Sequence, residues 1–192
     1  MNRGVLFLGM IAVAFLQACG GGSSSNTKEG LSSTNADALS SVVSSESSSS
    51  TPAQAAELEG VWKKFCGAAD LSDPDTHYDI ITVTFSGNTL FSSIENYEDA
   101  SCSVALSFAP NPTASGTFSI GNSVTLIDAT QAMELDSHIN TYNGAEFKID
   151  EYGLYRIEGD VVYFEDDTEV KDGSTPELRP NTLNYNRPFY RQ

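Results

Sequence analysis

The sequence predicts an all-β domain that folds as an antiparallel up-and-down barrel of about 8–10 strands, preceded by one short helix. A β-sandwich is the alternative. Apolar and polar residues alternate with a period of two along many short segments after residue 57. Sequences containing glycine or proline separate these segments, and few windows show the spacing of an amphipathic helix.

The N-terminal residues have the features of an export signal. Arg3 is followed by a run from Gly4 to Leu16 in which every residue is apolar or glycine. The run is shorter than the roughly 20 residues that a membrane-spanning helix needs, and it suits a signal peptide. The next residues, Leu16-Gln17-Ala18-Cys19, resemble the lipobox of bacterial lipoproteins. That resemblance implies a signal peptide over residues 1–18, cleavage before Cys19, and acylation of Cys19.

The same resemblance implies a location. Two fatty acyl chains, such as palmitate, hold a protein stably on a membrane, so the acyl chains on Cys19 are the expected membrane link. In enterobacterial sorting, aspartate after the cysteine resembles a signal for retention in the inner membrane. Here Gly20 follows. We therefore expect a lipid anchor in the outer membrane, at its periplasmic face or at the cell surface.

Residues 19–56 are predicted to form a disordered tether. Glycine and serine dominate this segment, and it contains no aromatic residue. Such a composition cannot bury enough apolar surface to offset the entropy lost on ordering. The segment is expected to hold the folded domain away from the bilayer.

The range 57–192 contains the tryptophan and every tyrosine of the chain, and it is long enough for one domain. Thr51-Pro52-Ala53-Gln54 resembles a capping box, which predicts a short helix from Pro52 to Leu58. Hairpin turns are predicted at Gly87-Asn88, Gly121-Asn122 and Gly159-Asp160. Strands are predicted, after one that opens near Gly60, within residues 79–85, 101–108, 117–126, 133–139, 146–149, 153–164 and 182–190.

Gly60-x-Trp62 follows the predicted helix and opens the first strand. This pattern resembles the start of lipocalins and related calycin barrels. In that family the tryptophan plugs one end of the barrel, and an arginine near the last strand lies across it. The resemblance implies that Arg187 or Arg191 packs its planar guanidinium on the indole of Trp62.

Two cysteines remain once Cys19 carries lipid. Export places Cys66 and Cys102 in an oxidising compartment, where disulfides persist. Counting by twos places Cys66 on the face of Trp62, and Cys102 falls on the apolar face of the predicted strand 101–108. We therefore predict a Cys66–Cys102 disulfide. A metal pair with His77 is the alternative, but the close Cys-x-x-Cys spacing of zinc sites is missing.

The net charge of the chain limits the classes of partner that it is expected to bind. Removing residues 1–18 takes away Arg3, the only charged residue there, so the formal net charge of −16 becomes −17. No basic stripe exists to neutralise phosphates, so we expect no nucleic-acid partner. An excess of acidic residues keeps a protein soluble and would attract a cationic protein.

Catalytic and metal-binding motifs do not stand out, so we expect no enzyme activity, no cofactor and no metal site. A Gly-x-Ser-x-Gly elbow is missing from the sequence. Glu134, Asp136 and His138 share one strand face, and we interpret them as a solvated face in preference to divalent-ion ligands. The acidic run from Glu165 to Asp172 lacks EF-hand spacing and is interpreted as a charged loop, not a calcium site.

The tyrosines are the candidate ligand-binding residues. In a small barrel some of them would line the interior or its mouth, which suits an amphipathic ligand. The function expected from the lipocalin resemblance is non-catalytic binding of a small apolar or amphipathic molecule. The alternative is an acidic protein-binding or structural envelope lipoprotein, for example an inhibitor of a cationic partner. The tyrosines singled out are Tyr152, Tyr155, Tyr163 and Tyr185.

Overall fold

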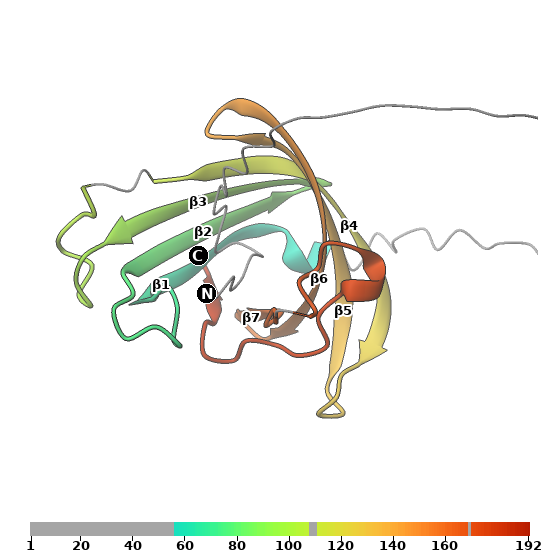
Figure 1. Ribbon diagram of the computed structural model, residues 1–192. Coiled ribbons are helices and arrows are strands. Elements are labelled where there is room, and N and C mark those ends of the chain that lie inside the picture. The colour runs from blue at the N-terminus through green and yellow to red at the C-terminus, as the bar shows by residue number, and fades with distance from the viewer. Residues whose placement is uncertain (1–55, 108–110, 169) are drawn as a thin grey trace, which may run out of the picture. The chain divides into compact units, whose positions relative to one another are not determined.

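The computed structural model describes residues 56–107, 111–168 and 170–192. The predicted signal peptide, the predicted acylation site Cys19 and almost all of the predicted tether lie outside the described residues. Eight antiparallel strands follow one another around a closed barrel, and the last pairs with the first (Figure 1). The predicted up-and-down barrel is therefore confirmed, and the β-sandwich alternative is wrong.

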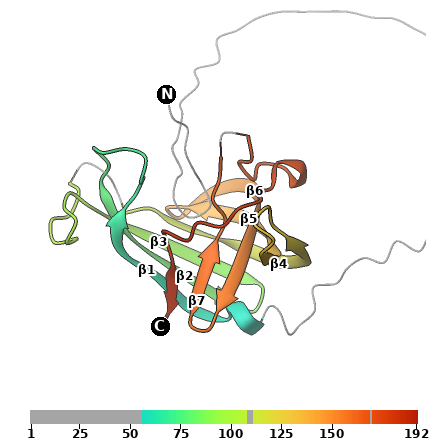
Figure 2. The ribbon, with the colours of Figure 1, turned by 90° about the horizontal axis from the view of Figure 1, so that it is seen from below.

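The strands differ greatly in length. Register shifts interrupt the β4–β5 pairing at residues 115–116 and 120–123 of β4 and the β5–β6 pairing at residues 139–141 of β5, and the two C-terminal strands are short. β8 lies beside β1 and closes the barrel (Figure 2). The bounds are β1 Gly60–Ala68, β2 Tyr78–Ser86, β3 Thr89–Tyr97, β4 Thr113–Thr125, β5 Gln131–Tyr142, β6 Ala145–Glu158, β7 Val161–Phe164 and β8 Phe189–Arg191.

One apolar core fills the middle of the barrel. Every strand contributes at least one buried side chain to it, as the two-residue alternation predicts. The Phe85 ring meets the Phe118 ring edge-on at 5.0 Å between centroids, and it stacks on the Phe164 ring at 6.4 Å. Phe164 in turn meets Phe189 at 5.1 Å. Phenylalanines from β2, β4, β7 and β8 therefore span the interior at this level, and no wide central cup exists there.

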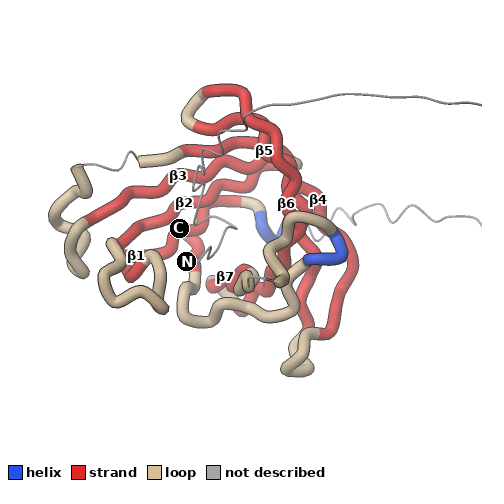
Figure 3. Tube along the Cα trace, viewed as in Figure 1, coloured by secondary structure: helices blue, strands red, loops and turns tan. Residues whose placement is uncertain are grey.

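The two ends of the barrel differ. At one end, which we call the tryptophan end, lie Trp62 and a helical turn at residues 56–58. At the opposite end, which we call the loop end, lie the connections 69–77, 98–107 and 165–188. Strands dominate the described chain, and the helical segments are this turn and a 3-10 turn at Pro176–Leu178 (Figure 3). Within the described residues, no helix has the length and apolarity needed to span a membrane.

The connection 165–188 completes the barrel wall where β7 ends. β7 pairs only with residues 155–158 of β6, which leaves the preceding part of β6 as an edge. The Glu165 carboxylate accepts the Leu154 N–H at 2.9 Å, and the Gly173 carbonyl accepts the Tyr152 N–H at 2.9 Å. A second apolar cluster also lies outside the wall, between β6 and this connection. The connection therefore covers an edge that would otherwise invite pairing with another chain.

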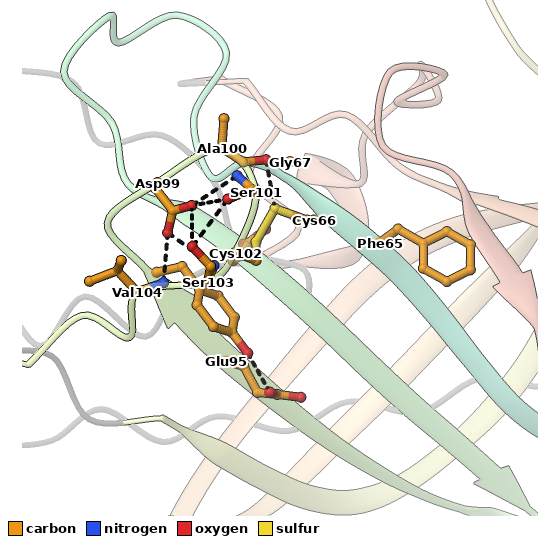
Figure 4. Close-up of a disulfide and its surroundings, with 12 residues drawn as sticks. Phe65, Cys66, Gly67, Glu95, Asp99, Ala100, Ser101, Cys102, Ser103 and Val104 are labelled. Atoms are coloured by element: carbon orange, nitrogen blue, oxygen red, sulfur yellow. Dashed lines mark hydrogen bonds between the residues drawn. A yellow bond between two sulfur atoms is a disulfide. The ribbon is translucent and has the colours of Figure 1, made fainter.

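The predicted strand at 101–108 is wrong, because a local turn takes its place. The Asp99 carboxylate accepts backbone N–H groups from Ser101, Ser103 and Val104 (Figure 4). The side-chain hydrogen bond from Ser101 and the backbone bond from Val104 hold the pKa of Asp99 well below its ordinary value. Side-chain acceptors of this kind compete with the sheet ladder for backbone donors. Only an isolated bridge from Tyr97 to Ala105 remains.

The predicted hairpin turn at Gly121-Asn122 is also wrong. These residues form a bulge inside β4, and the chain reverses at residues 126–130. The Glu134 carboxylate of β5 accepts the Asn122 N–H at 2.9 Å. A Cβ at Gly121 would lie 2.4 Å from the same carboxylate, so this glycine permits the close approach of the two strands. The turns predicted at Gly87-Asn88 and Gly159-Asp160 are confirmed.

Candidate functional site

A single arginine ties together the tryptophan end. The Trp62 side chain is fully buried, and its indole Nε1 donates to the carbonyl oxygen of Leu58 at 2.8 Å. The guanidinium carbon of Arg191 lies 4.1 Å from the centroid of the Trp62 ring. Its Nη1 and Nη2 donate to the carbonyl oxygens of Glu59 and Glu57, both at 2.7 Å. Arg191 thus joins the last strand to the first strand and to the helical turn.

Of the two other residues expected at the tryptophan end, Gly60 lies there and Arg187 does not. Gly60 has a φ of +118°, a conformation that favours glycine, and it lies next to the Arg191 guanidinium. Arg187 lies at the loop end instead, where its Nη2 donates to the Asp79 carboxylate at 2.8 Å. Of the two arginines that the sequence offered for Trp62, the structure therefore places Arg191 on the indole.

The loop end carries the Cys66–Cys102 disulfide, so the predicted pairing is confirmed. It joins β1 to the turn that Asp99 organises, and Phe65 points away from it (Figure 4). Cys102 sits in that turn with a φ of +49° and not on a strand, so the alternation argument reached the right pair from a wrong element.

An ionic group is buried inside the barrel toward the loop end. Asp79 is 2% exposed and Lys64 is 4% exposed, and their side chains form an ion pair. The second carboxylate oxygen of Asp79 accepts from Arg187. Burial lowers the pKa of Lys64, and the Asp79 carboxylate partly offsets this effect. The Asp79 carboxylate therefore pairs with the buried Lys64 and with the partly buried Arg187, and sequence analysis missed this group.

Two further carboxyl groups lie beside each other where β6 meets the end of β7. Burial, together with the negative charge of Asp167, raises the pKa of Glu151 to about 7. The same two causes raise the pKa of the buried Glu165 well above its ordinary value. Cross-strand from Glu151, the buried Ser137 hydroxyl has no hydrogen-bond partner within the described part of the chain. The raised pKa values mean that the Glu151 and Glu165 carboxyl groups hold protons near neutral pH that they would release in the unfolded chain.

The domain is therefore expected to be more stable at pH 5 than at pH 8. A carboxyl group with a raised folded pKa contributes stability below its unfolded pKa of about 4.3, and this contribution is lost as the pH rises through the folded value. The Glu165→Gln variant keeps an acceptor for the Leu154 N–H and removes the charge, so it should gain about 1–2 kcal/mol at pH 8. Urea unfolding at both pH values measures this. An equal loss at both would show that Glu165 acts only through its shape.

The outer face of β5 and β6 is an ion-pair surface. The Arg179 guanidinium lies 2.7 Å from the Asp136 carboxylate and 3.6 Å from that of Glu134, and His138 pairs with Asp150. Within the described residues, no group of three or more His, Cys, Asp or Glu side chains is suited to a metal ion. The Arg179 guanidinium occupies the position beside the Glu134 and Asp136 carboxylates where a metal ion would have to bind.

The four candidate tyrosines are not brought together. Tyr155 alone points into the barrel, where it is 1% exposed. Tyr152 lies on the outer face, and the guanidinium carbon of Arg179 lies 5.7 Å from the centroid of the Tyr152 ring. Tyr163 and Tyr185 form a ring pair at 5.1 Å outside the wall.

A hollow of about 280 Å³ lies inside the tryptophan end, between the helical turn and the inner faces of β4, β5 and β6. The apolar part of its wall comes from Ala132, Met133 and Ile157, and the polar part from Glu57, Ser123, Gln131, Tyr155 and Arg156. The buried Tyr155 hydroxyl has no hydrogen-bond partner among the residues that the structure describes. This hollow combines an apolar wall with one buried unpaired hydroxyl and one carboxylate at its border, which is the chemistry of a small-ligand site.

No family model matches the chain, and no curated protein matches it significantly. The class of the protein therefore comes from its architecture, which is a closed eight-stranded up-and-down barrel of lipocalin-like form. Barrels of this class accommodate small-molecule sites in their interior.

Proposed function

We propose that the protein is a lipid-anchored envelope lipoprotein whose barrel binds a small amphipathic molecule and performs no chemical step on it. The hollow at the tryptophan end supports this proposal, because the buried unpaired hydroxyl of Tyr155 and the Glu57 carboxylate border an apolar wall there. The lipobox-like residues before Cys19 support the anchor, and the composition of residues 19–56 supports a tether between anchor and barrel.

Native mass spectrometry of the protein purified from the membranes of its own host tests the binding function. We expect a small-molecule adduct that leaves when the barrel is unfolded. A bare protein mass under conditions that preserve the fold would contradict the proposal. The Cys19→Ser variant provides the control for the anchor, because it should leave the membrane fraction while keeping the barrel.

Capture of a cationic protein is the second candidate, supported by the formal net charge of −16 of the whole chain. A pull-down at low and high salt distinguishes the two. A partner recovered only at low salt would favour electrostatic capture, because salt screens attraction between exposed charges. Recovery of the small-molecule adduct without a protein partner would favour the binding barrel.

A further inference from the structure

The carboxylates at the tryptophan end are paired, with one exception. Glu59 accepts the Gly87 N–H at 2.9 Å, Glu158 lies 2.7 Å from Arg156, and Asp160 lies 4.0 Å from Arg191. The Glu57 carboxylate has no hydrogen bond or ion pair with the described residues, and Glu57 borders the hollow. A solvent-exposed negative charge without a counter-ion among the described residues therefore lies at the border of the hollow.

Tyr155 supplies a second unsatisfied group in the same wall. Its hydroxyl is buried without a hydrogen-bond partner, and leaving such a group unpaired is costly. Tyr155 and Glu57 border the same hollow, and burial together with the negative charge of Glu57 raises the pKa of Tyr155. The phenol therefore stays neutral near pH 7, and its oxygen can accept a hydrogen bond from a donor that enters the hollow.

The remaining polar side chains of the wall are already engaged. The Ser123 hydroxyl donates to Gln131 Oε1 at 3.2 Å, and Gln131 Nε2 donates to the Thr125 hydroxyl at 2.6 Å. Arg156 also borders the hollow, but its Nη2 faces Glu158 and its Nη1 donates to the Gln131 carbonyl oxygen at 3.4 Å. An anionic ligand would therefore meet the unpaired charge of Glu57 without gaining an unoccupied cation.

We propose that the ligand of the hollow is a small organic cation: an ammonium group that pairs with Glu57 and donates to Tyr155, on a short apolar body that contacts Met133 and Ile157. This inference rests on the proposed function and names the chemical class of its ligand. The volume of about 280 Å³ is at the lower limit of ligand sites, which favours a body of a few carbon atoms. The strongly acidic chain also raises the local concentration of cations.

Methionine methyl NMR gives a direct readout of the hollow. The chain has three methionines, and two of them, Met1 and Met10, lie in the predicted signal peptide. The mature, acylated protein with labelled methionine methyl groups therefore gives one resonance, that of Met133 in the wall of the hollow. Hexylammonium, hexanoate and hexanol carry the same apolar body with a positive, a negative and a neutral polar group, and a primary ammonium stays charged at neutral pH.

We expect hexylammonium to shift the Met133 methyl resonance in a saturable manner at concentrations where hexanoate does not. Glu57→Gln should weaken this binding by about tenfold or more, because it removes the counter-ion. Tyr155→Phe should weaken it severalfold and also raise the melting temperature of the free protein, because it removes an unpaired buried hydroxyl. Glu59→Gln is the matched control, since this neighbouring carboxylate is engaged with Gly87 and should leave the affinity unchanged.

The outcomes separate the two proposals. Binding of hexanoate or hexanol as tight as that of hexylammonium would overturn the cation inference and leave ligand binding in the hollow intact. Unchanged affinity in Glu57→Gln would overturn it as well. A Met133 resonance that none of the three probes moves would overturn the inference together with the hollow as the binding site.

Discussion

Replacing Asp79 with asparagine is expected to lower the free energy of unfolding by about 3–5 kcal/mol, because breaking a buried ion pair leaves an uncompensated charge. Asp79 is the one carboxylate in contact with both Lys64 and Arg187, and Lys64 is 4% exposed. Asparagine keeps the shape of the side chain and removes its charge. Urea denaturation followed by circular dichroism at neutral pH measures the loss.

Two companion variants make this prediction specific. Lys64→Met should cost much less than Asp79→Asn, because Asp79 then keeps Arg187 as its partner. In the double variant, Lys64→Met should recover part of the loss, since the unpaired buried ammonium is gone. A loss below about 1 kcal/mol in Asp79→Asn alone would mean that water reaches the Lys64 ammonium, and the buried ionic group would then have little effect on stability.

The alternation of residues predicted the barrel because most strands place apolar side chains inside and polar ones outside. β3 is the exception, and the predicted set lacks it. Its buried inner positions include Ser92 and Asn96, while Phe91 on its outer face is 47% exposed. The strand therefore lacks the pattern that indicates a half-buried strand. The turn at Gly87-Asn88 was the remaining signal, because a hairpin turn implies a second strand.

The ionic group and the hollow depend on contacts between distant parts of the chain. Lys64 lies 15 residues from Asp79, and Arg187 lies 108 residues from it, so no local spacing relates the three. The sequence did hold a partial signal, since Lys64 shares the inner face of β1 with Trp62. A charged residue on a buried face needs a partner, but the strand register was required to identify Asp79.

The position of Tyr155 in the candidate site also depends on strand register. The sequence singled out four tyrosines, and their positions relative to the wall follow from strand register, which places Tyr155 opposite Phe164 on the inner face. Its proximity to Glu57 arises because the helical turn folds back across the barrel end, where Arg191 holds the carbonyl groups of Glu57 and Glu59. Composition and motif spacing contain no information about such a closure.

Loss of the Cys66–Cys102 disulfide should cost about 4 kcal/mol, the chain-entropy value for a loop of this length. The two cysteines are 36 residues apart, and the loop between them includes all of β2 and β3. The turn that contains Cys102 is also held by the Asp99 hydrogen bonds to Ser103 and Val104. The native turn should therefore survive in the Cys66→Ala/Cys102→Ala variant, and the loss should come mainly from the freer unfolded chain.

Equilibrium unfolding of the oxidised protein, the reduced protein and the double alanine variant measures this loss, and the last two should agree. Hydrogen exchange at the amides of Ser103 and Val104 separates the two mechanisms, because their bonds to Asp99 do not require the disulfide. If these amides lose protection in the double alanine variant at denaturant concentrations far below its unfolding midpoint, the disulfide orders the loop end in the native state. If their protection follows global unfolding, the disulfide stabilises the barrel by restricting the unfolded chain, as we expect.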